Sequence, residues 1–181
     1  MNRPVPSGGL LPARALRGRM DDSTGPRREP PDLGDRWDDV LSDARATAAG
    51  YREDGWTVHE VYPGDVTPLV EEDGPPSLDV VLPDDEFTTV RRVVAEADRS
   101  FEACEVFRAS DGPVLFLVVV ERDDPTRTAV LYPVYYDTAR ATGFVRAAAE
   151  ADAVAVHLRA LSPDERVTFT HDDPSLFRPE R

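Results

Sequence analysis

The spacing of apolar positions changes several times along the chain, and each change marks an expected element. Between residues 35 and 53 apolar side chains recur at helical spacing, and Asp54-Gly55 suits the end of that helix. A second helix is predicted to begin at Asp84 or Asp85, after a proline, and a third after Asp137. The pattern therefore predicts three helices.

Strands are expected between and after these helices. Residues 56–62 and 78–82 are short apolar runs that end at prolines, and residues 65–77 between them are predicted to be a loop because prolines interrupt them. Strands joined by tight turns are predicted at residues 103–109, 114–120, 128–135, 154–161 and 166–170. Because tight turns join antiparallel neighbours, we expect an α+β fold with a mainly antiparallel sheet of about six or seven strands and three helices packed largely on one face.

The domain organisation follows from the same pattern. Residues 35–177 are expected to form a single α+β domain, with a tail at 178–181. Residues 1–34 are rich in Arg, Pro and Gly and are predicted to be a disordered arm, since they offer little apolar surface to bury. Residues 1–19 contain arginines and no acidic residue, which favours Met20 as an alternative start and residues 1–19 as a mis-assigned extension.

The charge is strongly acidic and changes the picture of the surface. The chain has 35 acidic residues against 21 basic ones, the formal net charge is -14, and every basic residue is arginine. The acids are spread along the chain past Met20 rather than gathered in one block, which is typical of adaptation to high salt, where screening removes self-repulsion. A nucleic-acid ligand is not expected, because phosphate binding needs a concentrated basic face.

Other function classes are excluded by absent patterns. No apolar run approaches the length of a membrane span, and residues 1–20 lack the apolar core of an export signal, so a cytoplasmic location is expected. Glycine-rich phosphate loops, H-E-x-x-H, C-x-x-C and G-x-S-x-G do not occur. The single cysteine, Cys104, lies in an alternating apolar run and is interpreted as a buried, inert thiol.

A metal site is one hypothesis for the histidines. His171 and His157, with Asp65 as a carboxylate ligand, are the candidates for such a site, although their spacing matches no known metal motif. The competing interpretation is structural, since His171 precedes an Asp-Asp-Pro sequence that is also an ordinary turn.

A small catalytic or anion-binding pocket is a second hypothesis. His157 and Arg159 alternate on one face of a predicted strand, and Arg159 could hold a carboxylate with its planar guanidinium. Together with His171 and Tyr135 they are the candidate catalytic residues. An exposed strand face with an ordinary surface ion pair explains His157 and Arg159 as well.

Several short runs together resemble an uncharacterised family of small haloarchaeal proteins over about residues 36–177. They are Tyr62-Pro63-Gly64-Asp65-Val66, Leu78-Asp79-Val80-Val81-Leu82-Pro83 with Glu86-Phe87, Tyr132-Pro133-Val134-Tyr135-Tyr136, His157-Leu158-Arg159-Ala160-Leu161 and Thr168-Phe169-Thr170-His171. Ala160 and Arg178 depart from the proline and the phenylalanine usual in that family. The resemblance supports a salt-rich habitat and implies no catalytic residue.

The function that the sequence predicts is accordingly general. We expect a non-catalytic cytoplasmic binding or accessory domain without a cofactor, whose partner is an unidentified protein or small molecule, and a homodimer through a sheet edge is a further expectation. The alternative is an enzyme with a small pocket formed by His157, Arg159, His171 and Tyr135. If the histidines bind a metal ion, this enzyme would be metal-dependent.

Overall fold

The computed structural model describes residues 33–180, in which three α-helices, eight strands and one short 3-10 helix follow one another. The helices are α1 (Leu33–Glu53), α2 (Asp84–Val94), α3 (Thr142–Glu150) and η1 (Pro174–Phe177). The strands are β1 (Thr57–Glu60), β2 (Asp65–Leu69), β3 (Ser77–Val81), β4 (Ala103–Asp111), β5 (Val114–Asp123), β6 (Thr128–Asp137), β7 (Val154–Arg159) and β8 (Arg166–His171). The predictions for the N-terminal arm fall on residues outside this range, except for Leu33 and Gly34, which begin α1.

The strands form two sheets of four, so the α+β class is confirmed and the single sheet is wrong. Sheet A has the order β1-β6-β5-β4, and sheet B has the order β2-β3-β7-β8. Both are mixed, because β1 pairs in parallel with β6, and β3 in parallel with β7. Tight turns join only some neighbours. The long connections leading from β1 to β6 and from β3 to β7 allow the parallel pairs that the turn pattern did not reveal.

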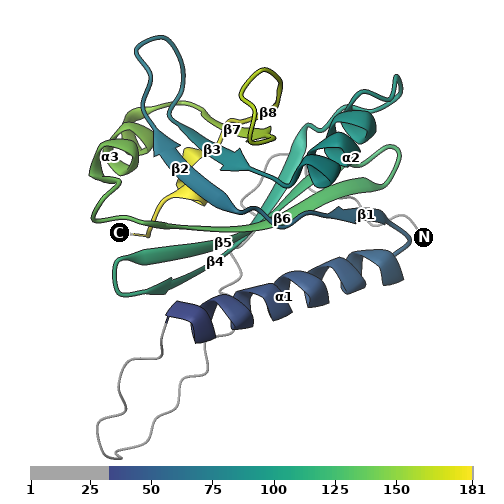
Figure 1. Cartoon of the computed structure of the whole chain (residues 1–181), viewed down its shortest axis with the longest axis horizontal. Coiled ribbons are helices and arrows are strands. Elements are labelled where there is room, and N and C mark those ends of the chain that lie inside the picture. The colour runs from purple at the N-terminus through teal and green to yellow at the C-terminus, as the bar shows by residue number, and fades with distance from the viewer. Residues whose placement is uncertain (1–32, 181) are drawn as a thin grey trace, which may run out of the picture.

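The helices cover different parts of the molecule, which corrects the prediction that they share one face. α1 lies along the outer face of sheet A, whereas sheet B, α2 and α3 lie on its other side (Figure 1). Two apolar cores result. One joins α1 to sheet A, and the larger one fills the space between the two sheets and includes side chains of α2 and α3.

Strand β5 contributes to both cores because sheet A is covered on both faces. Leu115, Leu117 and Val119 point into the core between the sheets, and the alternate residues point toward α1. A strand covered on both sides needs apolar residues at every position, which explains the unbroken run. The same alternation carries Glu121 onto the face that looks toward sheet B.

Strand β2 occupies part of the segment that was predicted to be a loop. Its Pro68 lacks the amide that a central strand would need, but β2 is the edge strand of sheet B and can accommodate a proline.

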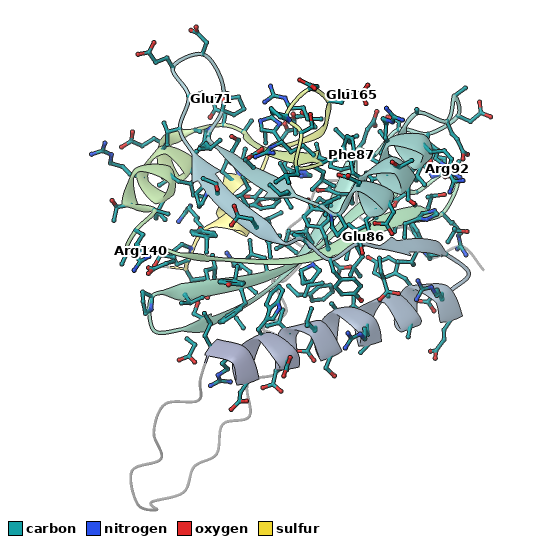
Figure 2. All side chains as sticks on the ribbon, in the orientation of Figure 1. Glu71, Glu86, Phe87, Arg92, Arg140 and Glu165 are labelled. Atoms are coloured by element: carbon teal, nitrogen blue, oxygen red, sulfur yellow. The ribbon has the colours of Figure 1, made fainter. Side chains whose placement is uncertain are left out.

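Most charged side chains lie at the surface of the molecule. Glu71, Arg140 and Glu165 stand out from loops and turns into solvent, while Phe87 is buried in the core (Figure 2). Among residues 33–180 no helix is both long and apolar enough to cross a bilayer.

Candidate metal centre

A carboxylate is buried in the core between the two sheets. Glu121, near the end of β5, has 0% of its surface exposed, and its register partner on the neighbouring strand β4 is Cys104. Both side chains lie on the same side of sheet A because directly opposed residues of an antiparallel pair share a face. A buried charged group normally has a partner of opposite charge or binds a metal ion.

Two further polar side chains meet this carboxylate. The Tyr132 hydroxyl, from β6, donates a hydrogen bond of 2.6 Å to Oε1 of Glu121. Nε2 of His171, the last residue of β8, lies 3.1 Å from the same oxygen. The other oxygen, Oε2, is buried and has no hydrogen-bond partner among the described residues. One carboxylate oxygen thus has two partners, and the other has none apart from the weak donor of the Cys104 thiol, which also interacts with this carboxylate.

The three side chains that could ligate a metal ion are close enough to share one. The ligand atoms of Cys104, Glu121 and His171 all lie within 4.8 Å of one another. Zinc binds sulfur, nitrogen and oxygen at about 2.0–2.3 Å, so ligands of a tetrahedral ion are roughly 3.3–3.7 Å apart. The observed cluster therefore needs a contraction of at most about 1.5 Å to hold such an ion.

The electrostatics of the cluster keep the metal-free thiol protonated. Burial, followed by the charge of Glu121, raises the pKa of Cys104 well above its usual value. Burial and then Glu121 and Cys104 also raise the pKa of Tyr132. No arginine among residues 33–180 forms an ion pair with Glu121, and His171 is the only partner that can carry a positive charge. The charge of Arg122 also acts on Cys104, but Arg122 is paired with Asp124, so the buried carboxylate has no arginine of its own and a cation would supply the missing positive charge.

The C-terminal segment closes one side of the cluster. The ring of Phe177, in η1, stacks on His171 with centroids 5.0 Å apart and planes at 20°. The Tyr136 hydroxyl donates a 2.7 Å hydrogen bond to the Phe177 carbonyl, and Arg108 of β4 donates to the carbonyls of Ser175 and Arg178. The two edge strands β4 and β8 are thus brought together by this segment, with the cluster between them.

Comparison with known proteins places the chain in a family. A model of a family of unknown function, DUF7529, matches residues 28–179. The chain belongs to the DUF7529 family. No curated protein and no solved structure matches it. The resemblance to an uncharacterised family is therefore confirmed at the level of the family, and a haloarchaeal origin stays a prediction.

Of the predicted site residues of this DUF7529 domain, only His171 lies in the cluster. His157 and Arg159 lie on the outer face of sheet B, where Nδ1 of His157 is 2.8 Å from the Thr168 hydroxyl. Arg159 binds both carboxylate oxygens of Asp79, with its Nη2 2.8 Å from Oδ2. The outer face thus holds an ion pair between Arg159 and Asp79, but this face is less exposed than the structural interpretation expected, since His157 is buried and both members of the pair are partly buried.

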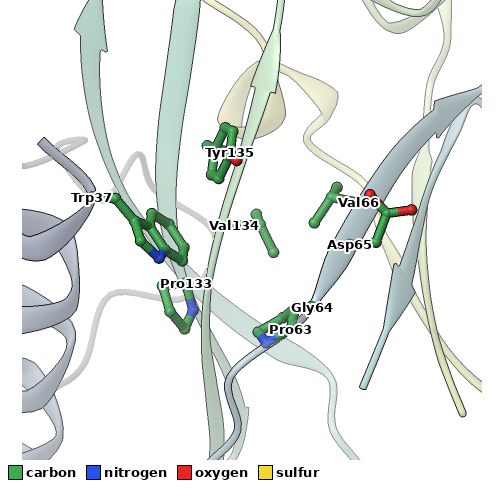
Figure 3. A pocket seen from close by; sticks show the side chains of 8 residues that line it. All are labelled: Trp37, Pro63, Gly64, Asp65, Val66, Pro133, Val134 and Tyr135. Atoms are coloured by element: carbon green, nitrogen blue, oxygen red, sulfur yellow. The ribbon is translucent and has the colours of Figure 1, made fainter. Parts of the chain in front are cut away.

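Tyr135 and Asp65 lie at a third place in the DUF7529 domain. They line a small pocket of about 80 Å³ between the start of α1, the start of β2 and the second half of β6, together with Trp37 and Pro133 (Figure 3). Tyr135 packs edge-on against Trp37 at a centroid distance of 5.0 Å. The four candidate catalytic residues therefore lie in three places and do not form one pocket.

Sequence reasoning missed Cys104, Glu121 and Tyr132 as members of the site. A signal for Glu121 was present, since alternation along 114–121 puts it on the same face as Leu117 and Val119. A carboxylate at a predicted core position indicates either an ion pair or a metal ligand. The partner on β8 could not be inferred, because 50 residues separate Glu121 from His171 and the two strands belong to different sheets.

Proposed function

We propose that this DUF7529 chain is a non-catalytic metal-binding domain whose ion is held by Cys104, Glu121 and His171. The observation that carries the proposal is the buried Oε2 of Glu121, for which the described residues show no hydrogen-bond partner and which lies beside a thiol and an imidazole. A bound cation would give this oxygen a partner and offset the cost of removing a carboxylate from water. Tyr132 would orient the ligand through the other oxygen.

The donor set favours zinc. Thiolate selects against Ca²⁺ and Mg²⁺, which prefer six or more oxygen ligands, and imidazole suits zinc and its first-row neighbours. Zinc accepts sulfur, nitrogen and oxygen ligands together in one tetrahedral site.

The burial of the ligands favours a structural or sensory role over catalysis. Glu121 is inaccessible and His171 is only 8% exposed, with Phe177 stacked on its ring, while Cys104 is half-buried. Catalytic zinc sites have three protein ligands and an open fourth position, whereas structural sites have four protein ligands. The three ligands here match the catalytic count, but the burial of Glu121 and His171 limits the access of substrate and agrees with the binding or accessory role expected from the sequence.

The test is a titration of the full chain, freed of metal with a chelator, with Zn²⁺ and Co²⁺. We expect one equivalent of either ion to bind, and bound Co²⁺ to show the near-ultraviolet absorption of a cobalt–thiolate bond. Cys104→Ser should remove this absorption, and His171→Gln should weaken zinc binding about 100-fold or more, since second-shell losses alone reach 10–100-fold. Absence of stoichiometric binding by the wild-type chain would refute the proposal.

His157→Gln is the matched control. It also removes a largely buried histidine with one side-chain hydrogen bond, but on the outer face of sheet B. We expect it to bind zinc as the wild type does. Equal losses in His157→Gln and His171→Gln would show that the histidine effect is general and not that of a ligand. Circular dichroism of each metal-free variant checks that the fold is intact.

Habitat and partners remain part of the proposal. We infer a salt-rich cytoplasm from the net charge of -14 and the absence of lysine, and an unidentified protein or small-molecule partner rather than nucleic acid. A single domain over residues 35–177 is proposed from the pattern of apolar positions, and a homodimer is proposed through a sheet edge.

A further inference from the structure

A second hollow of the molecule lies between α3 and the C-terminal segment. It has a volume of about 350 Å³ and is separate from the metal cluster, whose ligands do not line it. Val145 and Ala149 of α3 and Pro179 of the C-terminal segment form an apolar wall. Arg146 and Arg178 line the same space from the two sides. An apolar wall beside two guanidinium groups is an arrangement that suits an amphipathic anion.

Neither arginine forms an ion pair with a carboxylate of residues 33–180, although the chain is rich in acids. Eight of the arginines in residues 33–180 form ion pairs with carboxylates, and Arg146 and Arg178 are not among them. The Nε of Arg178 is buried and has no hydrogen-bond partner in the described chain. A buried donor without a partner is costly, so the Arg178 guanidinium is incompletely satisfied within the described chain.

The one carboxylate among the described residues that line the pocket is already engaged. Glu180 accepts a 2.8 Å hydrogen bond from Nη2 of Arg108, which also donates to the carbonyls of Ser175 and Arg178. The Glu180 charge is thereby directed toward Arg108, and the guanidinium groups of Arg146 and Arg178 are left without a carboxylate of the described chain.

We propose that this pocket binds an organic carboxylate, whose carboxylate group pairs with Arg146 and Arg178 and whose apolar body lies against Val145, Ala149 and Pro179. Guanidinium groups hold carboxylates through paired hydrogen bonds in a plane, so two of them can fix the charged end of the ligand. The apolar wall distinguishes this ligand from inorganic phosphate, which has no surface to place there. The proposal does not depend on metal binding.

The test is a titration of the full chain with benzoate, followed by nuclear magnetic resonance at constant ionic strength, with inorganic phosphate as the second probe. We expect saturable shifts of the Val145 and Ala149 amides with benzoate and a dissociation constant at least tenfold larger for phosphate. Arg146→Gln and Arg178→Gln should each weaken benzoate binding about tenfold or more, the effect of one charged hydrogen bond. Arg146 is exposed, so its replacement leaves the fold intact.

Arg92→Gln is the matched control, because Arg92 is an exposed arginine of a different helix that also forms no ion pair with a carboxylate of the described residues. It should bind benzoate like the wild type. The proposal is overturned by any of three results: no saturable benzoate binding, tighter binding of phosphate than of benzoate, or equal weakening by Arg92→Gln and Arg146→Gln.

Discussion

Replacement of Glu121 by Gln should have opposite effects on the stability of the metal-free and the metal-bound chain. Glu121→Gln keeps the shape of the side chain and the acceptor for the Tyr132 hydroxyl, but it removes the buried negative charge. Burial of an unpaired ion costs several kcal/mol, whereas charge-assisted hydrogen bonds contribute about 1.5–3 kcal/mol each. In the absence of metal these effects largely offset each other, so we expect the variant to be as stable as the wild type or more stable by about 1–2 kcal/mol.

With zinc present the order should reverse. An ion that binds only the folded chain stabilises it by about 2.7 kcal/mol when its free concentration is 100 times the dissociation constant. For a chain of this size each kcal/mol raises the unfolding temperature by about 2–4 °C, so the wild type should gain roughly 5–11 °C. Glu121→Gln should gain little, because a neutral amide is a poor ligand for zinc.

Thermal unfolding followed by circular dichroism, with and without zinc, measures both the stability of the metal-free variant and the stabilisation by zinc. The reasoning is refuted if zinc raises the unfolding temperature of the variant as much as that of the wild type. It is equally refuted if the metal-free variant is destabilised by more than about 3 kcal/mol, since the carboxylate would then be stabilising without an ion. His157→Gln again serves as the control with an unchanged site.

Three further predictions concern the rest of the fold. The unfolding temperature should rise between about 0.1 M and 1 M potassium chloride. The Debye length falls from roughly 10 Å to 3 Å over this range, so the added salt screens the repulsion that comes from the net charge of -14. A lower unfolding temperature at the higher salt concentration would contradict the halophilic interpretation. Burial, then nearby arginines, lower the pKa values of His59 and His157 in the folded chain below the usual 6.5. The unfolded chain therefore takes up more protons than the folded chain, and the free energy of unfolding falls as the pH drops below 6.5. In urea unfolding, the free energy of unfolding of His157→Gln should depend less steeply on pH than that of the wild type. An unchanged pH dependence would contradict this assignment. Tyr136→Phe should lower the free energy of unfolding by about 1–3 kcal/mol, because the buried carbonyl of Phe177 loses its donor, and a change within about 0.5 kcal/mol would show that the carbonyl finds another.

The sequence predicted local structure better than the arrangement of the strands. The helical spacing before Tyr51 and the Asp111-Gly112 turn identified α1 and the β4–β5 hairpin, because both depend on residues near one another in the chain. Pro68 led to the wrong prediction of a loop at β2, since a proline destabilises a central strand but is tolerated in a strand at the edge of a sheet. Asp137 was expected to cap α3, but its side chain accepts from the Ala139 amide and the helix begins at Thr142. Pairing between distant strands has no local signature, so the division into two sheets could not be read from the pattern.

The candidate site was predictable only in part for the same reason. His171 was selected as a histidine with acidic neighbours in sequence, yet Asp172 and Asp173 are exposed and the carboxylate it meets is Glu121. Cys104 was interpreted as inert, which agrees with its raised pKa in the metal-free chain. Its neighbour across the ladder changes that interpretation, because a thiol beside a carboxylate and an imidazole can lose its proton to a bound metal ion.

The acidity of the whole chain sharpens the argument for a buried site with a sulfur ligand. A surface that carries most of 35 acidic residues binds hard cations loosely at many places, and molar salt fills these places with sodium or potassium. Charge alone therefore cannot select one trace metal in the salt-rich cytoplasm that we propose. Selection needs soft or borderline donors, and the half-buried Cys104 and the buried His171 are such donors beside the inaccessible Glu121. The cysteine, and not the abundance of carboxylates, is thus the ligand that would give this domain its selectivity.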